Sequence, residues 1–203
     1  MRYSAEHKAQ TRDKLLASSG ALAKRGGFSA TGVDGLMKAI GLTGGAFYGH
    51  FASKDALFAA IVERELSHSV ALLGGDGSAP DKLRRCLDIY LSMRHVEQPD
   101  NGCALPTLGA EIARADLAVR ENAEHWLVRL QQAWGEALED PQLAWAILAQ
   151  CVGALLVARM LATPQRQAEV LARRTGGRIP PAGGLHCRRI ERRTAAGRRG
   201  ERD

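Results

Sequence analysis

The sequence lacks the patterns that mark β folds, metal centres and common catalytic sites. No segment alternates apolar and polar residues as a half-buried strand does, and no Asn-Gly turn joins two β-branched runs. No GxSxG, GxGxxG or GxxxxGK[ST] motif occurs, and the histidines form no HExxH pair. The four cysteines have no CxxC spacing, so neither a zinc site nor a disulfide framework is indicated. We expect an all-α protein that is not an enzyme and holds no metal or cofactor.

Long apolar runs and a signal-peptide core are also missing. The most apolar stretch, 143–158, is short of a membrane span and contains Gln150, so we interpret it as a buried helix. Residues 1–14 are polar and charged. The chain of 203 residues is 45% hydrophobic and 25% charged, which is typical of a soluble globular protein with a real core. We expect a cytoplasmic protein with no membrane partner.

The net charge of +6 is unevenly distributed. Residues 1–64 carry nine lysines and arginines against five acids, whereas residues 65–172 carry nine against fourteen. Residues 173–203 carry ten arginines against three acids. A basic first segment beside an acidic middle indicates that only the first part meets a polyanion.

Apolar residues recur with helical spacing from the start of the chain. A first helix is expected over residues 8–25, with Gly26 or Gly27 as its stop. Thr31 followed by Asp34 fits a capping box that begins a second helix, and Gly41 ends it. A third helix is expected to begin at Thr43. The short connection containing glycine is typical of a helix-turn-helix.

Further helices are expected along the remainder of the chain. The stretch 74–80 is the best candidate for a linker because it is rich in glycine and ends in proline. The expected helices are 53–73, 81–95, 104–113, 116–139, 141–161 and a short last helix after Pro164.

The third helix has few side chains on one face. Phe47 and Phe51 lie four residues apart and are expected to pack against the first two helices. The other face would enter a major groove, and large side chains there would hold the backbone away from the bases. Polar groups for DNA contact remain nearby. The residues that we expect at the DNA are Thr31, Thr43, Gly44, Gly45, Ala46, Tyr48, His50 and Lys54.

Residues 11–66 resemble the DNA-binding domain of TetR/AcrR-type transcriptional repressors. The matching motifs are Gly41-Leu42-Thr43, then Phe47-Tyr48-Gly49-His50-Phe51, then Ser53-Lys54-Asp55-Ala56-Leu57. The resemblance implies a three-helix DNA-binding domain over 8–66 and a helical ligand-binding and dimerisation domain over 80–170. It also implies phosphate contacts from Thr31, Tyr48 and Lys54, a homodimer and a double-stranded DNA operator.

The function expected from this resemblance is repression that a small molecule relieves. A dimer on a palindrome holds two recognition helices about one DNA turn, ~34 Å, apart, and a ligand that favours another spacing lowers DNA affinity. The helix over 53–73 is the expected lever. Candidate ligand contacts are Met93, Leu105, Leu108, Trp126, Trp134 and Trp145, although each of these residue types is also ordinary core.

Two features leave alternatives open. Cys103 follows Asn-Gly near the start of a short helix, so it is a candidate redox or electrophile sensor, or else a structural cysteine. Residues 173–203 are rich in arginine, glycine and proline and are expected to be disordered, either as a nucleic-acid tether or as a replaced C-terminus. A helical interaction module that has lost specific DNA binding is a further alternative.

Overall fold

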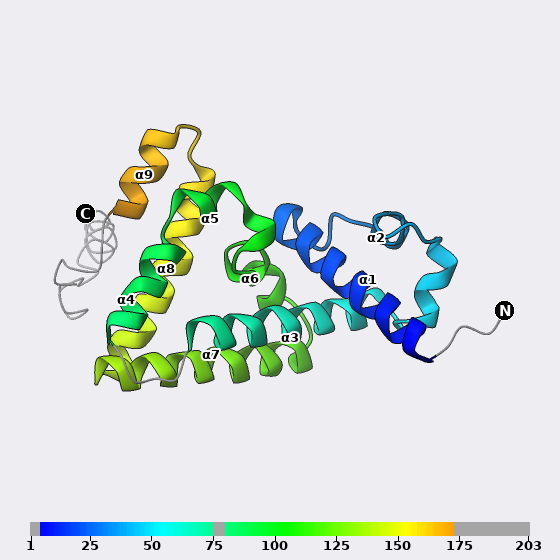
Figure 1. Cartoon of the computed structure of the whole chain (residues 1–203), viewed down its shortest axis with the longest axis horizontal. Coiled ribbons are helices and arrows are strands. Elements are labelled where there is room, and N and C mark those ends of the chain that lie inside the picture. The colour runs from blue at the N-terminus through cyan, green and yellow to red at the C-terminus, as the bar shows by residue number, and fades with distance from the viewer. Residues whose placement is uncertain (1–4, 75–79, 173–203) are drawn as a thin grey trace, which may run out of the picture. The chain divides into compact units, whose positions relative to one another are not determined.

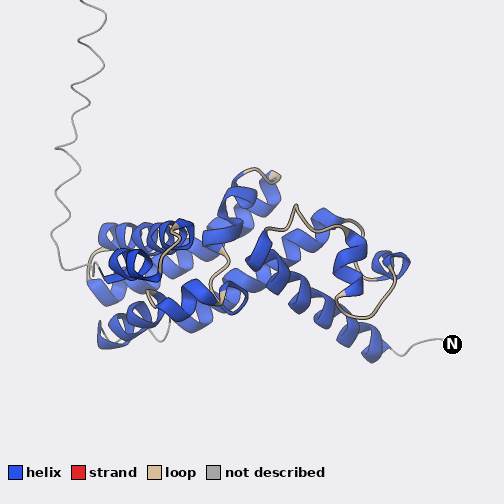
Figure 2. Ribbon diagram, turned by 90° about the horizontal axis from the view of Figure 1, so that it is seen from above, coloured by secondary structure: helices blue, strands red, loops and turns tan. Residues whose placement is uncertain are grey.

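The computed structural model describes residues 5–74 and 80–172, and every regular element in these ranges is helical (Figures 1 and 2). The expected disordered tail, 173–203, lies outside them. The α-helices are α1 (Ala5–Gly26), α2 (Val33–Lys38), α3 (Lys54–Leu73), α4 (Pro80–Tyr90), α5 (Met93–Glu97), α6 (Leu105–Ala113), α7 (Leu117–Leu138), α8 (Pro141–Met160) and α9 (Pro164–Ala172). Two short 3₁₀ helices are η1 (Gly44–Gly49) and η2 (Pro99–Asn101). The all-α prediction is confirmed.

Local sequence signals set most helix ends. Gly27 and Gly41 follow α1 and α2 with φ angles of 86° and 73°, a backbone region that glycine enters without steric cost. The hydroxyl of Ser53 accepts a hydrogen bond from the Ala56 N–H and caps α3. Asp116 and Asp140 cap α7 and α8 in the same way.

Two expectations about the helices are wrong. Gly32, not Thr31, is the N-cap of α2, and no side chain caps this helix. The predicted helix over 81–95 is divided, because α4 ends at Tyr90 and α5 begins at Met93. We call α1, α2, η1 and the first half of α3 the head. Its third helix, η1, is a 3₁₀ helix, whose tighter winding is common in short pieces.

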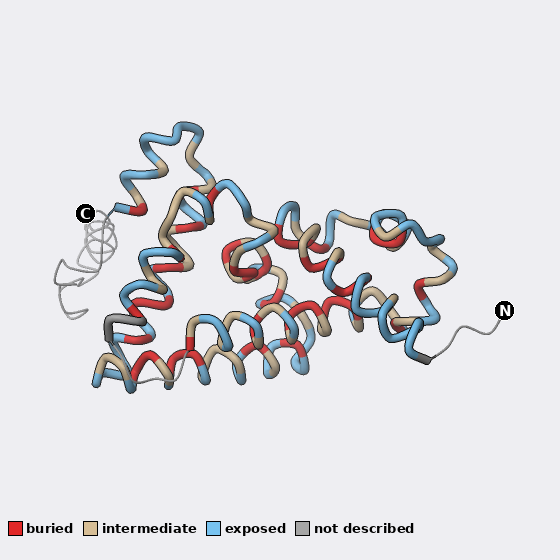
Figure 3. The backbone as a smooth tube through the Cα atoms, viewed as in Figure 1, coloured by how far each residue is buried: buried red, intermediate tan, exposed pale blue. Residues whose placement is uncertain are grey.

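The buried apolar residues form two cores. Figure 3 marks the buried residues in red along the backbone. The first core joins α1, α2, η1 and the first half of α3 to α6 and the beginning of α7. The second joins α4, α5, α8 and α9 to the end of α7. Residues from both expected domains therefore share the first core: Leu36, Phe47 and Ile61 lie in it with Leu108 and Ala123.

Helix α8 is long and apolar enough to cross a membrane by length and composition, but one face of this helix packs in the second core. Six of its residues are buried, on one side of the helix: Ala144, Ile147, Leu148, Cys151, Leu155 and Ala158. A soluble core helix passes the same length test, so this helix is weak evidence for a membrane.

Polar contacts join the N-terminal helices to the remainder of the fold. The carboxylate of Glu111 on α6 accepts hydrogen bonds from the N–H groups of Phe28 and Ser29, at 2.8 and 2.9 Å, and from the Ser29 hydroxyl. Glu63 on α3 accepts from the indole N–H of Trp126 and from Asn122, both on α7. These two carboxylates fix the α1–α2 loop and α3 respectively.

We predict that Glu111→Gln removes part of the acid dependence of stability. Burial raises the pKa of Glu111, but the hydrogen bonds from Ser29 and Phe28 outweigh it and lower the pKa below 4.5. A depressed carboxyl pKa contributes stability that is present above the unfolded value and is lost as the pH falls through the folded value. Thermal unfolding between pH 7 and pH 3 should show a lower midpoint at neutral pH and a shallower acid decline for the variant.

The matched control for this experiment is Glu121→Gln, which changes an exposed glutamate on α7. It should leave both the midpoint and its pH dependence close to wild type. Identical pH profiles for Glu111→Gln and the wild type would show that the loop contact contributes nothing.

Candidate functional site

The short helix η1 is fixed from one side by aromatic rings. Phe47 is fully buried, and its ring centroid lies 6.1 Å from that of Phe51, which is also buried. The guanidinium of Arg12 on α1 lies over the Phe51 ring, 4.5 Å from its centroid. Burial of the two rings against the first core offsets the conformational cost of the three glycines in this segment.

The glycines of η1 serve different purposes. A Cβ at Gly44 would overlap with the carboxylate of Asp34, so this glycine allows η1 to approach α2. A Cβ at Gly45 or Gly49 would meet no atom within 4 Å. Packing within this chain therefore does not require glycine at positions 45 and 49, and the outer surface of η1 has no side chain at either position.

Polar side chains of the head surround this bare surface. Tyr48 is 68% exposed although its ring packs edge-on against Phe47, and Thr43 is exposed at the beginning of η1. Thr31 is half-buried, and its hydroxyl makes no cap contact with α2. Ala46 is half-buried and packs against the first core.

His50 and Lys54 take part in the structure of the head. Burial lowers the pKa of His50, and the nearby cations Lys8 and Arg12 lower it further, so the ring is neutral at pH 7. The ammonium of Lys54 donates to the Ser29 carbonyl at 3.2 Å and lies over the Phe28 ring. The contact places Lys54 at the α1–α2 loop, and DNA contact by either residue stays a prediction.

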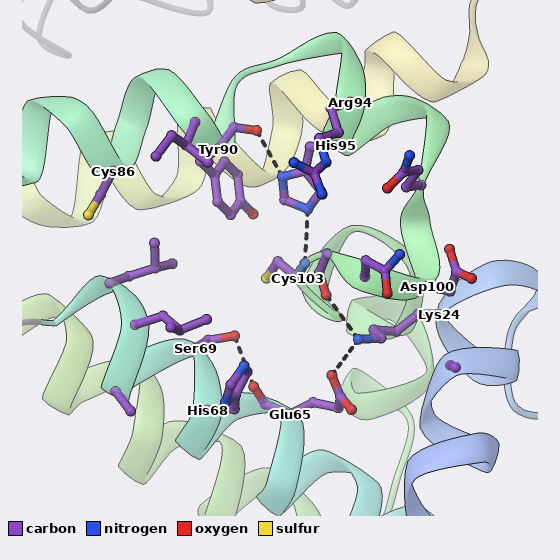
Figure 4. A pocket seen from close by; sticks show the side chains of 18 of the residues that line it. Lys24, Glu65, His68, Ser69, Cys86, Tyr90, Arg94, His95, Asp100 and Cys103 are labelled. Carbon is purple, nitrogen blue, oxygen red and sulfur yellow. Dashed lines mark hydrogen bonds and ion pairs between the residues drawn. The ribbon is translucent and has the colours of Figure 1, made fainter.

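A cleft of about 950 Å³ opens between α1, α3, α4, α5 and η2 (Figure 4). On its inner wall, the Nδ1–H of His95 donates to the Tyr90 carbonyl at 2.8 Å, and Nε2 accepts from the Cys103 N–H at 2.9 Å. These two bonds require the neutral ring with its proton on Nδ1. Burial lowers the pKa of His95, which agrees with that state.

The residue before Cys103 joins this wall to the head. A Cβ at Gly102 would overlap with the His95 ring, so only glycine fits beneath it. The Gly102 carbonyl accepts from the ammonium of Lys24 at 3.1 Å, and Lys24 also pairs with Glu65 at 2.7 Å. Lys24 thereby links α1, α3 and the chain segment between η2 and α6.

Cys103 itself is a buried thiol. Burial raises its pKa, and contacts with the Tyr90 hydroxyl and the more distant Lys24 ammonium offset only part of that effect. The guanidinium of Arg159 on α8 lies close by and donates to the carbonyl of His95 at 2.8 Å. Sequence distance concealed both cations, since they lie on α1 and α8.

Five of the six predicted ligand contacts lie in or against the two cores, and Trp145 lies in neither. Leu108 is buried in the first core, and Met93 packs against the second. The indole of Trp126 donates to Glu63, the indole of Trp134 donates to the Leu73 carbonyl at 3.0 Å, and Trp145 is 39% exposed on α8. Their role in ligand binding stays a prediction.

Three of these six residues, Leu105, Trp126 and Trp134, surround a void of about 10 Å³ behind Tyr90. That volume holds roughly one water molecule. None of the six lines the larger cleft. The sequence did not predict this cleft because its lining residues come from segments that are far apart in the chain.

Within residues 5–74 and 80–172, no group of three or more His, Cys, Asp or Glu side chains could hold a metal ion. Cys86, Cys103 and Cys151 are free thiols.

Comparisons with known proteins place this geometry in a family. The family model described as "Bacterial regulatory proteins, tetR family" matches residues 15–61. The HTH-type transcriptional repressor NemR of Escherichia coli K12 is 29% identical over 107 residues, which are 50% of this chain and 54% of that protein. The chain therefore matches about half the length of this curated relative.

Solved structures extend the likeness to most of the chain. The reduced form of Escherichia coli NemR is 25% identical, with a TM-score of 0.65 over 80% of this chain and 93% of that one. A TetR transcriptional regulator from Legionella pneumophila shares the fold at 19% identity, with a TM-score of 0.67 over 85% and 96%. The family model over residues 15–61, together with the similarity to NemR in sequence and in structure, identifies the chain as a TetR-family transcriptional regulator.

Proposed function

We propose that this regulator is a repressor that binds a palindromic operator as a homodimer and releases it when a small molecule binds. The observation that best supports DNA binding is the outward surface of η1. Tyr48 is exposed there, and Gly45 and Gly49 leave the backbone open. A backbone without side chains can approach base edges closely, while the hydroxyls of Tyr48 and Thr43 can bind phosphates. That NemR is named a transcriptional repressor supports the direction of control.

Positive charge near η1 also favours DNA as the partner. The guanidinium of Arg12 on α1 lies 4.5 Å from the centroid of the Phe51 ring, next to η1, and Arg12 and Lys8 both lower the pKa of His50. Phosphates attract such cations irrespective of sequence. A protein that acts on chromosomal DNA in this way would work in the cytoplasm.

The polar links between the head and the remainder of the fold supply a route for release. Lys24 contacts Gly102, the Thr107 hydroxyl donates to the Lys24 carbonyl at 2.8 Å, and Glu111 binds the α1–α2 loop. A ligand that changes the position of η2 or α6 would therefore change that of α1. The effect on DNA affinity equals the difference in ligand affinity between the two arrangements.

The exposed side of α8 supports a dimer. Apolar side chains there include Trp145, Leu156, Val157 and Met160, and a Cβ at Gly153 would meet no atom within 4 Å. Exposed apolar surface of this extent on one helix is typical of an interface, and an open glycine permits close helix approach. A second copy of this chain would cover the surface and place two heads on one duplex.

We predict that Gly45→Leu and Tyr48→Ala each weaken binding to the preferred duplex by about 1–3 kcal/mol. The first adds bulk where the backbone meets the groove, and the second removes a phosphate contact. Selection from a random DNA pool gives the preferred duplex, and mobility shifts at fixed salt give the affinities.

Gly26→Leu is the matched control, since a Cβ at Gly26 also meets no atom within 4 Å. It should leave DNA affinity unchanged. A pool that returns only salt-sensitive, sequence-independent binding, together with unchanged affinity in both test variants, would refute the operator. That outcome would favour the alternative of an interaction module without specific DNA binding.

A charge on the exposed side of α8 should separate the dimer. We predict that wild-type protein sediments as a dimer and that Leu156→Glu sediments as a monomer, because the charge would be buried without a partner. Leu117→Glu places the same charge at an exposed leucine at the start of α7 and should remain dimeric. A monomeric wild-type protein at micromolar concentration would contradict the assembly.

A second candidate function is redox sensing by Cys103. Two observations favour it: Lys24 and Arg159 place positive charge near the thiol, and a related repressor was crystallised in a form described as reduced. Cations stabilise a thiolate and the anionic products of its oxidation. Burial of the thiol opposes this function because it raises the pKa.

The redox candidate predicts that hydrogen peroxide lowers the DNA affinity of the wild type and of Cys86→Ser but not of Cys103→Ser. Cys86 is the control because it lines the same cleft and is half-buried. Peptide mass spectrometry would report an added oxygen on Cys103. Oxidation confined to Cys86, or an unchanged response in Cys103→Ser, would exclude the sensor.

A further inference from the structure

The cleft between α1, α3, α4, α5 and η2 has the size of a small-molecule site. Its volume of about 950 Å³ lies within the range of about 300–1,000 Å³ that such sites occupy. The side chains in Figure 4 come from both sides of this space, with Tyr90 and His95 on one side and Glu65 and Ser69 on the other.

The cleft has an excess of unpaired positive charge. Its two carboxylates are each paired with a cation, Glu65 with Lys24 and Asp100 with Arg25. Among the described residues, the guanidinium of Arg64 donates only to a backbone carbonyl, at 3.4 Å, and Arg94 has no ion pair. Two exposed guanidinium groups in one cleft favour an anion.

Apolar side chains line the same cleft without protein cover. Leu72 on α3 is 60% exposed, and Ile89 on α4 is 73% exposed. Ala17 and Ala21 on α1 add small apolar groups to the lining. Together these residues offer contact to an apolar body of a ligand.

The hydroxyl of the buried Tyr90 lies at the wall of this space with only a thiol as its neighbour. Tyr90 is only 6% exposed, and its hydroxyl lies beside the Cys103 thiol but reaches no nitrogen or oxygen within hydrogen-bonding distance in the described parts of the chain. Figure 4 shows the ring directed from α4 into the cleft. A thiol is a weak hydrogen-bond partner, so a ligand oxygen or nitrogen would satisfy this hydroxyl better.

We propose that the cleft binds a small organic anion, a carboxylate or phenolate with an apolar body. Its charge lies toward Arg64 and Arg94, its body contacts Leu72 and Ile89, and a polar atom meets the Tyr90 hydroxyl. The identification of this anion as the effector rests on the proposed repressor function, whereas the binding site itself does not.

The position of the cleft explains how its occupant would act on DNA binding. Three lining residues, Ala17, Ala21 and Lys24, belong to α1, the first helix of the DNA-binding head. A ligand here touches the head directly and lies beside the Lys24–Glu65 pair. A ligand that fits a wider separation of α1 from η2 selects that arrangement and shifts the head.

Three naphthalene derivatives that differ in charge provide the test. Isothermal titration calorimetry on the full chain would use 1-naphthoate, neutral 1-naphthamide and cationic 1-naphthylmethylammonium. We expect 1-naphthoate to bind roughly tenfold more tightly than the amide, and the ammonium to bind most weakly.

Variants assign the binding to the cleft. Arg94→Gln changes an exposed side chain, so the fold is kept, and it should weaken 1-naphthoate about fivefold while leaving the amide unchanged. Tyr90→Phe removes only the hydroxyl and should weaken both ligands. Arg120→Gln makes the same charge change at an exposed position on α7 that does not line the cleft, and it should weaken neither.

Equal affinity for the anion and the amide would overturn the proposal. So would an absence of saturable 1-naphthoate binding up to about 1 mM, a wild-type affinity in Arg94→Gln, or equal effects of Arg94→Gln and Arg120→Gln. Operator affinity is measured separately on the same samples. Anion binding at the cleft without any change in operator affinity supports the site and contradicts only the proposed release.

Discussion

One unbroken helix, α3, passes through both cores, and the remainder of the fold is arranged around it. Leu57, Ile61 and Leu66 anchor its first half among the helices of the head, whereas Val70 and Leu73 pack its end against the second core. A helix anchored at both ends cannot bend without unpacking one of them, because close-packed interiors lose contact energy with small displacements. Movements of the head therefore involve the whole of α3 as a rigid unit.

The joints around α3 are polar, in contrast to the cores. Lys24 with Glu65, Glu111 with the α1–α2 loop, and Glu63 with Trp126 all join helices through hydrogen bonds or ion pairs. Partly exposed hydrogen bonds such as those of Glu111 can be exchanged for water at small net cost, whereas the buried Lys24–Glu65 pair and a buried leucine are costly to break. The contact of Glu111 with the α1–α2 loop is therefore less costly to break than the ion pair that joins α1 to α3.

Sequence reasoning was most accurate where the determining contacts are local. The stop at Gly26 or Gly27, the stop at Gly41 and the burial of Phe47 were predicted from neighbours within one or two turns. The prediction of a cap at Thr31 was wrong because Glu111, 83 residues away from Phe28, holds the preceding loop and gives the cap position to Gly32. The cleft was not predicted because it also depends on distant contacts. Helical periodicity shows which face of a helix is apolar, but it does not show where two helices separate and leave a cleft.

The placement of the cleft also relates the two candidate modes of control. Cys103, His95 and the carbonyl of Gly102 form its inner wall, and Lys24 connects that wall to α1. An anion bound against Tyr90 and an added oxygen on Cys103 would both place negative charge or bulk between η2 and α3. Either change would lie beside the contacts of Lys24 with Gly102 and Glu65 and would disturb them. Noncovalent and oxidative signals would thus converge on one ion pair, and their effects on DNA affinity would not be additive because residues that share a partner are coupled.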